Sequence, residues 1–460
     1  MNGALLVTAL AEELALFAGV GFLLFALDDL AVDLIYGARR LWRGAAIYSR
    51  FPRAFAETLP RPATLGWLAV FIPAWDESAV IGPMLRTTLA RFGPAEGAGD
   101  YRLFVGHYRN DPATAAAIHS VGNARVLPVA VESDGPTTKA DCLNHLHAAL
   151  LMEEVARGVR ARAIVLHDAE DVVHPAELAI FDRLIGRAAA IQLPVVPLPD
   201  PASPWIAGHY GDEFAESHGK ELVVREAVGA AIPLAGVGCA IERGALDRLA
   251  AMNGGDPFAA DSMTEDYEIG LRLGAMGLKT MFVRIPALPG DRAAVATRGH
   301  FPATLDAAVR QKARWIGGIA FAGWERLGWQ GGLGERWMRL RDRRGPFAAL
   351  LMVAGYGAAL LWAQLEVAHA LGAPMTPGVG TRLALLLKVN LALLCWRMLV
   401  RALFTTAAYG IWQGLLSVPR LLVANLIAIL AVRRALAVHG AGAPARWDKT
   451  AHIYPRELGV

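Results

Sequence analysis

The chain has 460 residues, of which 55% are hydrophobic and 19% are charged, and its formal net charge is only +3. A mean hydropathy of +0.36 is high for a soluble enzyme and predicts that part of the chain lies in a membrane, whereas the small net charge gives no indication of nucleic-acid binding. The three cysteines, Cys142, Cys239 and Cys395, include no Cys-x-x-Cys pair, which argues against a disulfide framework and a zinc site. We therefore expect the part outside the membrane to face the reducing cytosol.

The first apolar segment, residues 4–27, is interrupted only by two adjacent glutamates and is long enough for one membrane-spanning helix. No basic residues precede it, which argues against a signal peptide. Arginines follow it between positions 39 and 53, so the positive-inside rule puts the N-terminus outside and the next domain in the cytosol. Asp28 and Asp29 come directly after the segment. They can cap a helix or bind a ligand at the membrane surface, and we favour the structural role.

The region from Leu65 to about Val283 alternates short apolar runs with helical, alanine-rich stretches, which is the pattern of an α/β sheet domain. Four apolar runs predict strands at residues 67–73, 101–106, 126–131 and 164–166. Each predicted strand ends in polar residues, and open α/β sheets bind ligands at the carboxyl ends of their strands. We therefore expect the four loops to line one rim. Residues 191–210 are rich in proline and predict an extended connection to a helix at 211–228.

Three acids, Asp168, Glu170 and Asp171, follow the apolar run at 164–166. Carboxylates at the end of a buried strand are hard oxygen donors that suit Mg²⁺ or Mn²⁺ carrying a phosphorylated substrate. The alternative is that the acids only solvate a loop or cap a helix at Pro175. The three residues by themselves favour neither interpretation.

Two later stretches add candidates for the same rim. Gly236 and Gly238 permit close approach of the backbone to a ligand, although a tight bend in a strand is the simpler explanation. Thr264, Glu265 and Asp266 open a predicted helix that runs to about residue 276, with Thr264 as its cap. Acids in a first helical turn are common, so this motif is only moderately specific.

The C-terminal third returns to a membrane-like composition. Residues 306–345 mix tryptophan with arginine, which suits a helix lying in the membrane interface. Spanning candidates follow at residues 346–371 and about 382–404. Between Arg420 and Arg433 only 12 residues are free of charge, too few to cross a hydrocarbon core of roughly 30 Å. We therefore predict three spanning helices and an interfacial or re-entrant tail, with a fourth span as the alternative.

Five stretches in this order resemble the membrane-embedded family 2 glycosyltransferases, those related to cellulose and hyaluronan synthases. The stretches are Ile72-Pro-Ala-Trp-Asp-Glu77, Lys139 with Asn144, Asp168-Ala-Glu170, Thr264-Glu-Asp266 and Gln311-x-x-Arg314-Trp315. The last two are the most specific, because Thr-Glu-Asp followed about 45 positions later by Gln-x-x-Arg-Trp beside apolar helices is hard to obtain by chance.

The chain resembles in particular an inner-membrane, phage-adsorption type within that family. The shared features are Asp28-Asp29, Asn110-Asp-Pro-Ala-Thr114 and Trp447-Asp-Lys-Thr-Ala-His452. Proteins of that type often continue into a domain that binds cyclic di-GMP, and we carry no such regulation over to this chain.

The resemblance implies a GT-A fold, an α/β Rossmann-like mixed sheet inserted between transmembrane and interfacial helices. It implies that the nucleotide-sugar donor is bound by Pro73, Trp75, Glu77, Asp111, Lys139, Asn144, Asp168 and Arg314. Asp168 would hold Mg²⁺ or Mn²⁺ with Glu170 or Asp171, because the motif reads Asp-Ala-Glu-Asp rather than Asp-x-Asp. His167 and His174 are interpreted as structural or outer residues, since diphosphate-bound Mg²⁺ prefers oxygen ligands.

The resemblance also implies an acceptor side and a catalytic group. The acceptor side would be formed by Gly236, Gly238, Gln311 and Trp315. Asp266 would be the general base on the acceptor hydroxyl, with Thr264 and Glu265 beside it. The sugar would then be transferred by one inverting displacement without an enzyme nucleophile.

The expected domains are an N-terminal transmembrane helix with a basic segment (1–50), a cytosolic GT-A domain (51–320), an interfacial helix (321–345) and C-terminal transmembrane and interfacial helices (346–460). The expected function is the transfer of a sugar from a UDP-sugar to a glycan or lipid acceptor. The enzyme would lie among the lipids of the bacterial inner membrane. The expectation extends to processive polysaccharide synthesis with an envelope export partner. One alternative is a non-catalytic envelope scaffold or phage-receptor component that retains the fold. A metal-dependent phosphohydrolase explains the acidic loops but not Gln-x-x-Arg-Trp.

Overall fold

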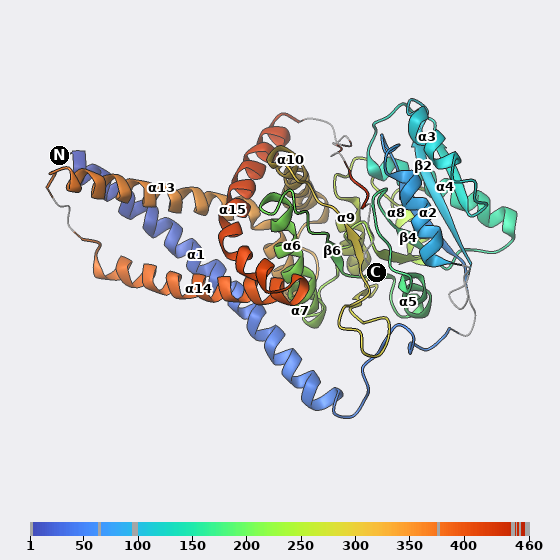
Figure 1. Ribbon diagram of the computed structural model, residues 1–460, viewed down its shortest axis with the longest axis horizontal. Coiled ribbons are helices and arrows are strands. Elements are labelled where there is room, and N and C mark those ends of the chain that lie inside the picture. The colour runs from blue at the N-terminus through green and yellow to red at the C-terminus, as the bar shows by residue number, and fades with distance from the viewer. Residues whose placement is uncertain are drawn as a thin grey trace.

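The computed structural model of the chain describes residues 3–62, 66–93, 100–374, 378–442, 447, 449 and 452–455. Within these residues, four helices are long and apolar enough to cross a membrane: α1 (Gly3–Trp42), α13 (Gly345–Ala370), α14 (Thr381–Tyr409) and α15 (Ile411–Gly440). Between α1 and α13 the chain folds into an α/β unit that lies at one end of the helices (Figure 1).

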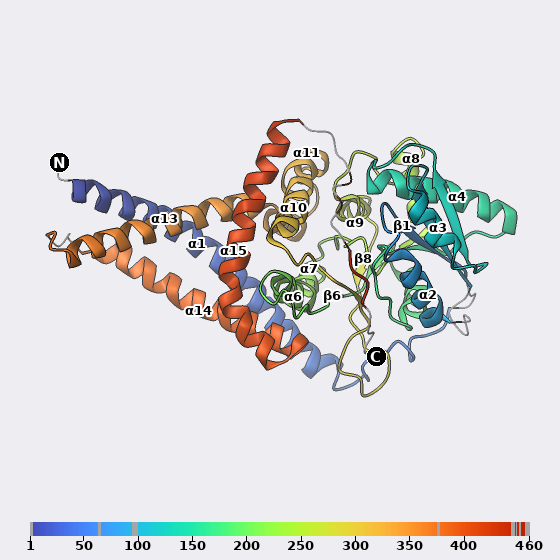
Figure 2. The same cartoon turned by 45° about the horizontal axis from the view of Figure 1, so that its top comes forward.

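The four apolar helices are not arranged alike. The N-terminal part of α1 projects away from the α/β unit together with α13 and α14, whereas α15 lies across the inner ends of α13 and α14 in both views (Figures 1 and 2). Arg420 of α15 is buried, 2.9 Å from the Asp212 carboxylate of the α/β unit, and donates to the carbonyl of Pro204 at 3.2 Å. A charged side chain held in this way favours an interfacial α15 over a fourth span, and the number of spans stays a prediction.

The main sheet has seven strands in the order β3 (Val126–Val131), β2 (Tyr101–Tyr108), β1 (Leu68–Pro73), β4 (Ala163–Leu166), β7 (Cys239–Glu242), β5 (Ala190–Gln192) and β8 (Thr280–Phe282). The four strands predicted from the sequence are parallel neighbours, and β7 is antiparallel to both β4 and β5. The extended connection expected at 191–210 instead contributes to β5 and to β6 (Val195–Pro197), which pairs with β9 (Thr297–Gly299). Strands of three residues have too little periodicity to be recognised in a sequence.

Both faces of the sheet are covered, as the unbroken apolar runs predict. β1 is buried throughout, and its alternate side chains enter opposite cores: Val70 and Ile72 face one, Ala69 and Phe71 the other. The first core is completed by α2 (Ile81–Phe92), α3 (Pro112–His119) and α5 (Glu177–Leu184). The second is completed by α4 (Lys139–Arg157), α8 (Arg243–Met252) and α9 (Glu265–Ala275).

The remaining helices connect the sheet to the apolar helices. The predicted helix at 211–228 is α6 (Ile206–Glu216) and α7 (Leu222–Ala227), joined by a π-helical turn (Ser217–Glu221). After β9 come α10 (Leu305–Ile316), a π-helical segment (Gly317–Ala322), α11 (Gly323–Leu327) and α12 (Leu333–Arg343). Trp324, expected at the membrane interface, is 45% exposed, and Arg343 lies over its ring.

Candidate functional site

The carboxyl ends of β1, β2 and β4 meet at one rim, and a buried acid links the first two. Asp111, after β2, accepts hydrogen bonds from the backbone N–H of Asp76 at 2.6 Å and of Thr114 at 3.2 Å. It thereby caps α3 and fixes the loop after β1. Glu77 in that loop is buried, and its N–H donates to the Thr114 hydroxyl at 2.9 Å.

Lys139, the first residue of α4, joins two acidic groups of the rim. Its Nζ lies 2.5 Å from Asp168 Oδ1, after β4, and 3.9 Å from Glu265 Oε1, at the start of α9. Burial alone would lower the pKa of Lys139, but Asp168, Glu265 and Asp266 raise it, so the side chain is a cation at neutral pH. The expected donor-side acid and the expected catalytic acids therefore share one partly buried positive charge.

The turn after β4 places its three acids differently. Asp171 Oδ2 accepts from the Asp168 N–H at 3.0 Å and lies 2.9 Å from His167 Nδ1, while His167 Nε2 lies 2.6 Å from Glu177. Burial alone would lower the pKa of His167, but Glu177 and Asp171 raise it to about 10. His167 therefore holds the turn together, and Asp171 is committed to this contact.

Glu170 points to the other side of the turn. Burial, with the neighbouring charges of Asp168, Asp171 and Glu77, raises the pKa of Glu170 to about 8, although His452 opposes this. Its Oε2 atom is buried and accepts no hydrogen bond from the described residues. A buried carboxylate oxygen that accepts no hydrogen bond within the described part of the chain and lies among other acids fits a bound cation, so the residues of this turn are suited to a divalent metal.

Glu265 and Asp266 lie in the first turn of α9, as predicted, but Thr264 does not cap the helix with its side chain. The Thr264 hydroxyl is instead buried without a hydrogen-bond partner among the described residues, close to Gly318. Burial, followed by the charge of Asp266, raises the pKa of Glu265 to about 7. Burial also raises the pKa of Asp266 although Lys139 opposes it, so burial outweighs the lowering expected from a helix N-terminus.

The two glycines after α7 have different neighbours. Gly236 has φ +72°, and a Cβ built there would lie 2.6 Å from Asp266 Oδ2. Gly238 has φ +56°, and a Cβ built there would lie 2.2 Å from the hydroxyl of Thr297, the first residue of β9. Gly236 therefore lets the backbone approach the candidate base, whereas Gly238 serves the packing of β9.

Three residues expected to bind the donor have structural contacts. Asn144 is buried and exchanges both amide hydrogen bonds with the backbone of Phe258, at 2.9 and 3.1 Å, so its polar atoms are used inside the fold. The donor contact expected of Asn144 would have to compete with these two hydrogen bonds, and it stays a prediction. Trp75 packs edge-on against Tyr108 with ring centroids 5.2 Å apart, and Pro73 is the buried end of β1.

The Gln-x-x-Arg-Trp motif lies on α10. The charge of Arg314 lowers the pKa of both Glu265 and Asp266 against the larger effect of burial, so its guanidinium belongs to the same electrostatic group. Trp315 meets Tyr210 edge-on at 6.1 Å, and Gln311 Oε1 is buried without a hydrogen-bond partner among the described residues. The motif thus borders the rim from the side of the apolar helices.

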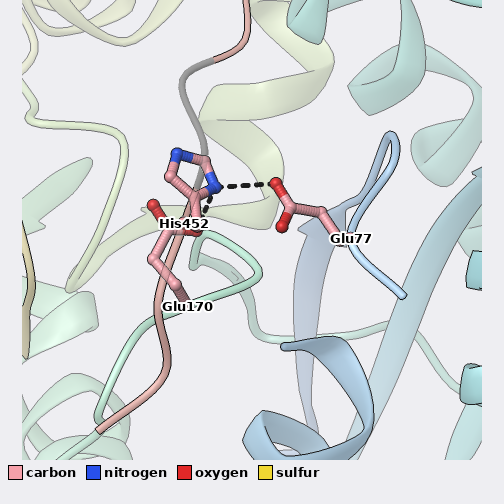
Figure 3. Close-up of side chains that lie close together, drawn as sticks. All are labelled: Glu77, Glu170 and His452. Atoms are coloured by element: carbon pink, nitrogen blue, oxygen red, sulfur yellow. Dashed lines mark hydrogen bonds and ion pairs between the residues drawn. The ribbon is translucent and has the colours of Figure 1, made fainter. Parts of the chain in front are cut away.

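The sequence prediction assigned no role to the C-terminal segment that lies over the rim, defined here by Trp447, Lys449 and residues 452–455. Trp447 N–H donates to the Thr137 carbonyl at 2.8 Å, and Lys449 binds the Asp76 carbonyl. His452 Nδ1 lies 2.7 Å from Glu77 Oε1 and 3.2 Å from Glu170 Oε2 (Figure 3).

The signal that could have found this segment was the Trp447–His452 motif itself, of which Asp448, Thr450 and Ala451 lie outside the described part of the chain. Burial alone would lower the pKa of His452, but Glu170 and Glu77 raise it to about 9. At neutral pH the segment therefore brings two cations, Lys449 and His452, to the acids after β1 and β4.

A mixed sheet with acids, a partly buried lysine and a Gln-x-x-Arg-Trp helix at one rim is the architecture that the resemblance to family 2 glycosyltransferases implies. Residues 64–318 match the family described as "Glycosyltransferase like family 2". Because this match spans more than half of the chain, the chain belongs to that family. The family and the α/β fold class predicted from the sequence are thereby confirmed.

Two curated relatives are the bacteriophage adsorption protein B of Escherichia coli K12 and the bacteriophage N4 adsorption protein B of Escherichia coli O157:H7. Each is 36% identical over 475 residues, covering 97% of this chain and 63% of the relative. The chain thus spans less than two thirds of the length of these relatives.

Similar solved structures are more distant. The mannosyltransferase PcManGT of Pyrobaculum calidifontis, in complex with GDP-Man and Mn²⁺, is 17% identical with a TM-score of 0.48, covering 89% of this chain and 99% of that one. The glucosyl-3-phosphoglycerate synthase of Mycobacterium tuberculosis, with Mn²⁺, UDP-glucose and glycerol 3-phosphate, is 19% identical with a TM-score of 0.34, covering 60% and 88%.

Proposed function

We propose that the chain is an inverting membrane glycosyltransferase that moves a sugar from a UDP-sugar to a glycan or lipid acceptor. The observation that carries the proposal is the position of Lys139 between Asp168 and Glu265. One partly buried cation holds the acid expected on the donor side next to the acids expected on the acceptor side. A solvated loop or a helix cap would need no such arrangement.

The donor side is formed by the loops after β1 and β4. A divalent cation bound there, Mg²⁺ or Mn²⁺, would neutralise charge on the leaving diphosphate. Asp168 and Glu170 are the residues suited to hold it, since Asp171 is engaged with His167. Asp111 acts by fixing the loop that carries Glu77, and we assign it a positioning role.

The acceptor side is formed by the start of α9 and by α10. Asp266 takes the proton from the acceptor hydroxyl, the acceptor oxygen bonds to the anomeric carbon, and the bond from that carbon to the diphosphate oxygen breaks with its electron pair leaving on the diphosphate. A pKa raised by burial makes Asp266 a stronger base than a solvated aspartate. The charge of Lys139, beside both acid groups, stabilises the anionic leaving group.

The proposed location is the bacterial inner membrane with the α/β unit in the cytosol. α1 carries Arg39 and Arg40 in its last turn, next to the α/β unit, in agreement with the positive-inside rule. Processive synthesis and an envelope export partner remain extensions of the proposal. The domain bounds 1–50, 51–320, 321–345 and 346–460 are kept as the working division.

The test is a panel of UDP- and GDP-sugars offered to the purified protein in lipid, scored for nucleotide release and for glycosylated product. We expect one UDP-sugar to give both, and Asp266→Asn to give neither. Nucleotide release that is independent of any acceptor would indicate a phosphohydrolase. Donor binding and turnover absent across the whole panel would instead support a non-catalytic envelope scaffold, a role that the name of the phage-adsorption relatives keeps open.

A further inference from the structure

Three side chains from distant parts of the sequence converge above the rim (Figure 3). Glu77 comes from the loop after β1, Glu170 from the turn after β4, and His452 from the C-terminal segment. Their nearest ligand atoms, two carboxylate oxygens and an imidazole nitrogen, all lie within 4.8 Å of one another. This is a donor set of the kind that holds a transition-metal ion, not a cluster of acids alone.

The hydrogen bonding within the group is incomplete. His452 Nδ1 can carry one proton, and its hydrogen bond is made to Glu77 Oε1 at 2.7 Å. Glu170 Oε2 lies 3.2 Å from the same nitrogen, but it is buried and accepts no hydrogen bond from the described residues. One proton therefore serves two carboxylates, whereas one metal ion can be bound by all three groups at once.

The His452 side of this group borders a cavity. A cavity of about 860 Å³ lies between the start of α2 and the C-terminal segment, and its lining includes Arg86, Thr87, His452 and Tyr454. A metal site needs an entry path as well as ligands of the right type and spacing.

We propose that Glu77, Glu170 and His452 form a divalent-cation site that prefers Mn²⁺ to Mg²⁺. The preference follows from the ligand types: both ions accept carboxylate oxygens, but an imidazole nitrogen binds Mn²⁺ better than the smaller, oxygen-selective Mg²⁺. The inference rests on the proposed function, because Glu170 is also one of the residues proposed to hold the metal ion on the donor side. The C-terminal segment thus supplies a metal ligand and is held over the donor site by the ion it binds.

If His452 only neutralised the glutamates, the predicted effect of its removal on metal binding would have the opposite sign. If the imidazolium only neutralises the two glutamates, it competes with a metal ion, and its removal must strengthen metal binding. If the imidazole is a ligand, its removal must weaken metal binding. The sign of the change therefore separates the two roles.

The experiment is a titration of the full-length protein in lipid with Mn²⁺ alone, without nucleotide, following the loss of the free-Mn²⁺ signal by electron paramagnetic resonance. We expect His452→Ala to weaken Mn²⁺ binding at least about tenfold, the lower end of what disturbing a metal ligand's surroundings costs. Mg²⁺ binding, measured by competition, should change much less, so that the Mn²⁺ preference falls.

The matched control is Lys449→Gln, in the same segment. Lys449 Nζ lies 3.3 Å from Glu77 Oε1 and carries positive charge but is not a metal ligand when protonated. Its loss should leave Mn²⁺ binding unchanged or slightly stronger. His452→Gln, which keeps the size of the side chain, and thermal unfolding of each variant exclude a folding defect as the cause.

Mn²⁺ binding that is unchanged or stronger in both His452 variants, or equal losses in His452→Ala and Lys449→Gln, would overturn the inference. So would an absence of Mn²⁺ binding by the wild-type protein. None of these results depends on sugar transfer. Failure of the proposed function would show instead as Mn²⁺ binding that follows the expected pattern in a protein with no transferase activity.

Discussion

Replacing Gly236 by alanine tests the assignment of Asp266 as the base without changing a titratable group. Gly236 has φ +72°, and a Cβ at this position would lie 2.6 Å from Asp266 Oδ2 and 3.1 Å from Lys139 Nζ. Ordinary contact begins at 3.4 Å, so the Asp266 carboxylate must retreat by roughly 0.8 Å along that line. The substitution therefore moves the candidate base while leaving its chemistry intact.

Two effects of Gly236→Ala have different sizes. The left-handed backbone conformation costs an L-residue about 1–2 kcal/mol of stability, wherever in the chain it occurs. Displacing a reacting group by about 1 Å can lower the rate on the order of 10²-fold. We expect kcat to fall by about that factor while donor affinity changes only a few-fold, since the Cβ crowds Lys139 less than Asp266 and no donor-side acid is among its nearest described neighbours.

Gly229→Ala is the matched control, because Gly229 has φ +74° and no atom lies within 4 Å of the Cβ position. Both variants should lose similar stability in thermal unfolding, and only Gly236→Ala should lose transfer, measured as the initial rate at saturating donor. Equal transfer rates in the two variants would show that the approach of Gly236 to Asp266 has no catalytic meaning. A loss of donor binding as large as the loss of rate would place Asp266 on the donor side instead.

Three further outcomes can be checked. Asp168→Asn should abolish metal-dependent donor binding, whereas Asp266→Asn should bind nucleotide almost normally and transfer about 10²–10⁴-fold more slowly; isothermal titration and rate assays distinguish them, and reversed results would exchange the two roles. In a variant without other reactive cysteines, a cysteine at exposed Leu371 should be labelled only from the external side of the membrane, and one at exposed Met252 only from the cytosolic side. The reverse labelling pattern would show that the topology is inverted. The pKa of His167 is raised from 6.5 to about 10, so its stabilising contribution is complete below pH 6.5 and is lost as pH rises towards 10. His167→Asn should therefore flatten this decline in stability, measured by thermal unfolding across that pH range. An unchanged slope would show that His167 is not the source of the decline.

The rim was predictable because it depends on local signals. Each of the first four strands is an apolar run that stops at polar residues, and parallel pairing then brings Asp111 and Asp168 to the same edge of the sheet. The Thr-Glu-Asp and Gln-x-x-Arg-Trp motifs are likewise contiguous in sequence. The fold then brings Glu265 of the first motif within 3.9 Å of Lys139, which also contacts Asp168.

The direction in which a side chain points was not predictable. Asn144 lies on the first turns of α4 beside the rim, but both ends of its amide bind the Phe258 backbone, 114 positions away. Asp171 turns to His167 while Glu170, one residue before it, turns away. Contacts between residues this far apart in sequence depend on how whole helices and strands pack together. Residue types and their local spacing do not determine that packing.

The C-terminal segment was missed for a related reason. Trp447 and His452 were recognised as a shared motif, but the apolar helices α13, α14 and α15 separate them from the sheet in sequence. Only the transverse path of α15 returns the chain to the rim (Figure 1). A prediction that treats the C-terminal region as membrane-associated has no basis for placing its last residues beside Glu77.

The acids near the end of the first apolar segment show how the apolar helices are tied to the catalytic unit. α1 continues unbroken to Trp42, so Asp28 and Asp29 lie within it and cap no helix. Arg344 donates to Asp28 at 2.7 Å and to Asp29 at 2.6 Å, and Arg341 of α12 donates to Asp29 at 3.0 Å. Partly buried ion pairs of this kind are costly to break, because separating them leaves uncompensated charges near the membrane. α1 therefore cannot slide past α12 without breaking several charged contacts together, and the same two aspartates fix the position of α1 against the junction of α12 and α13.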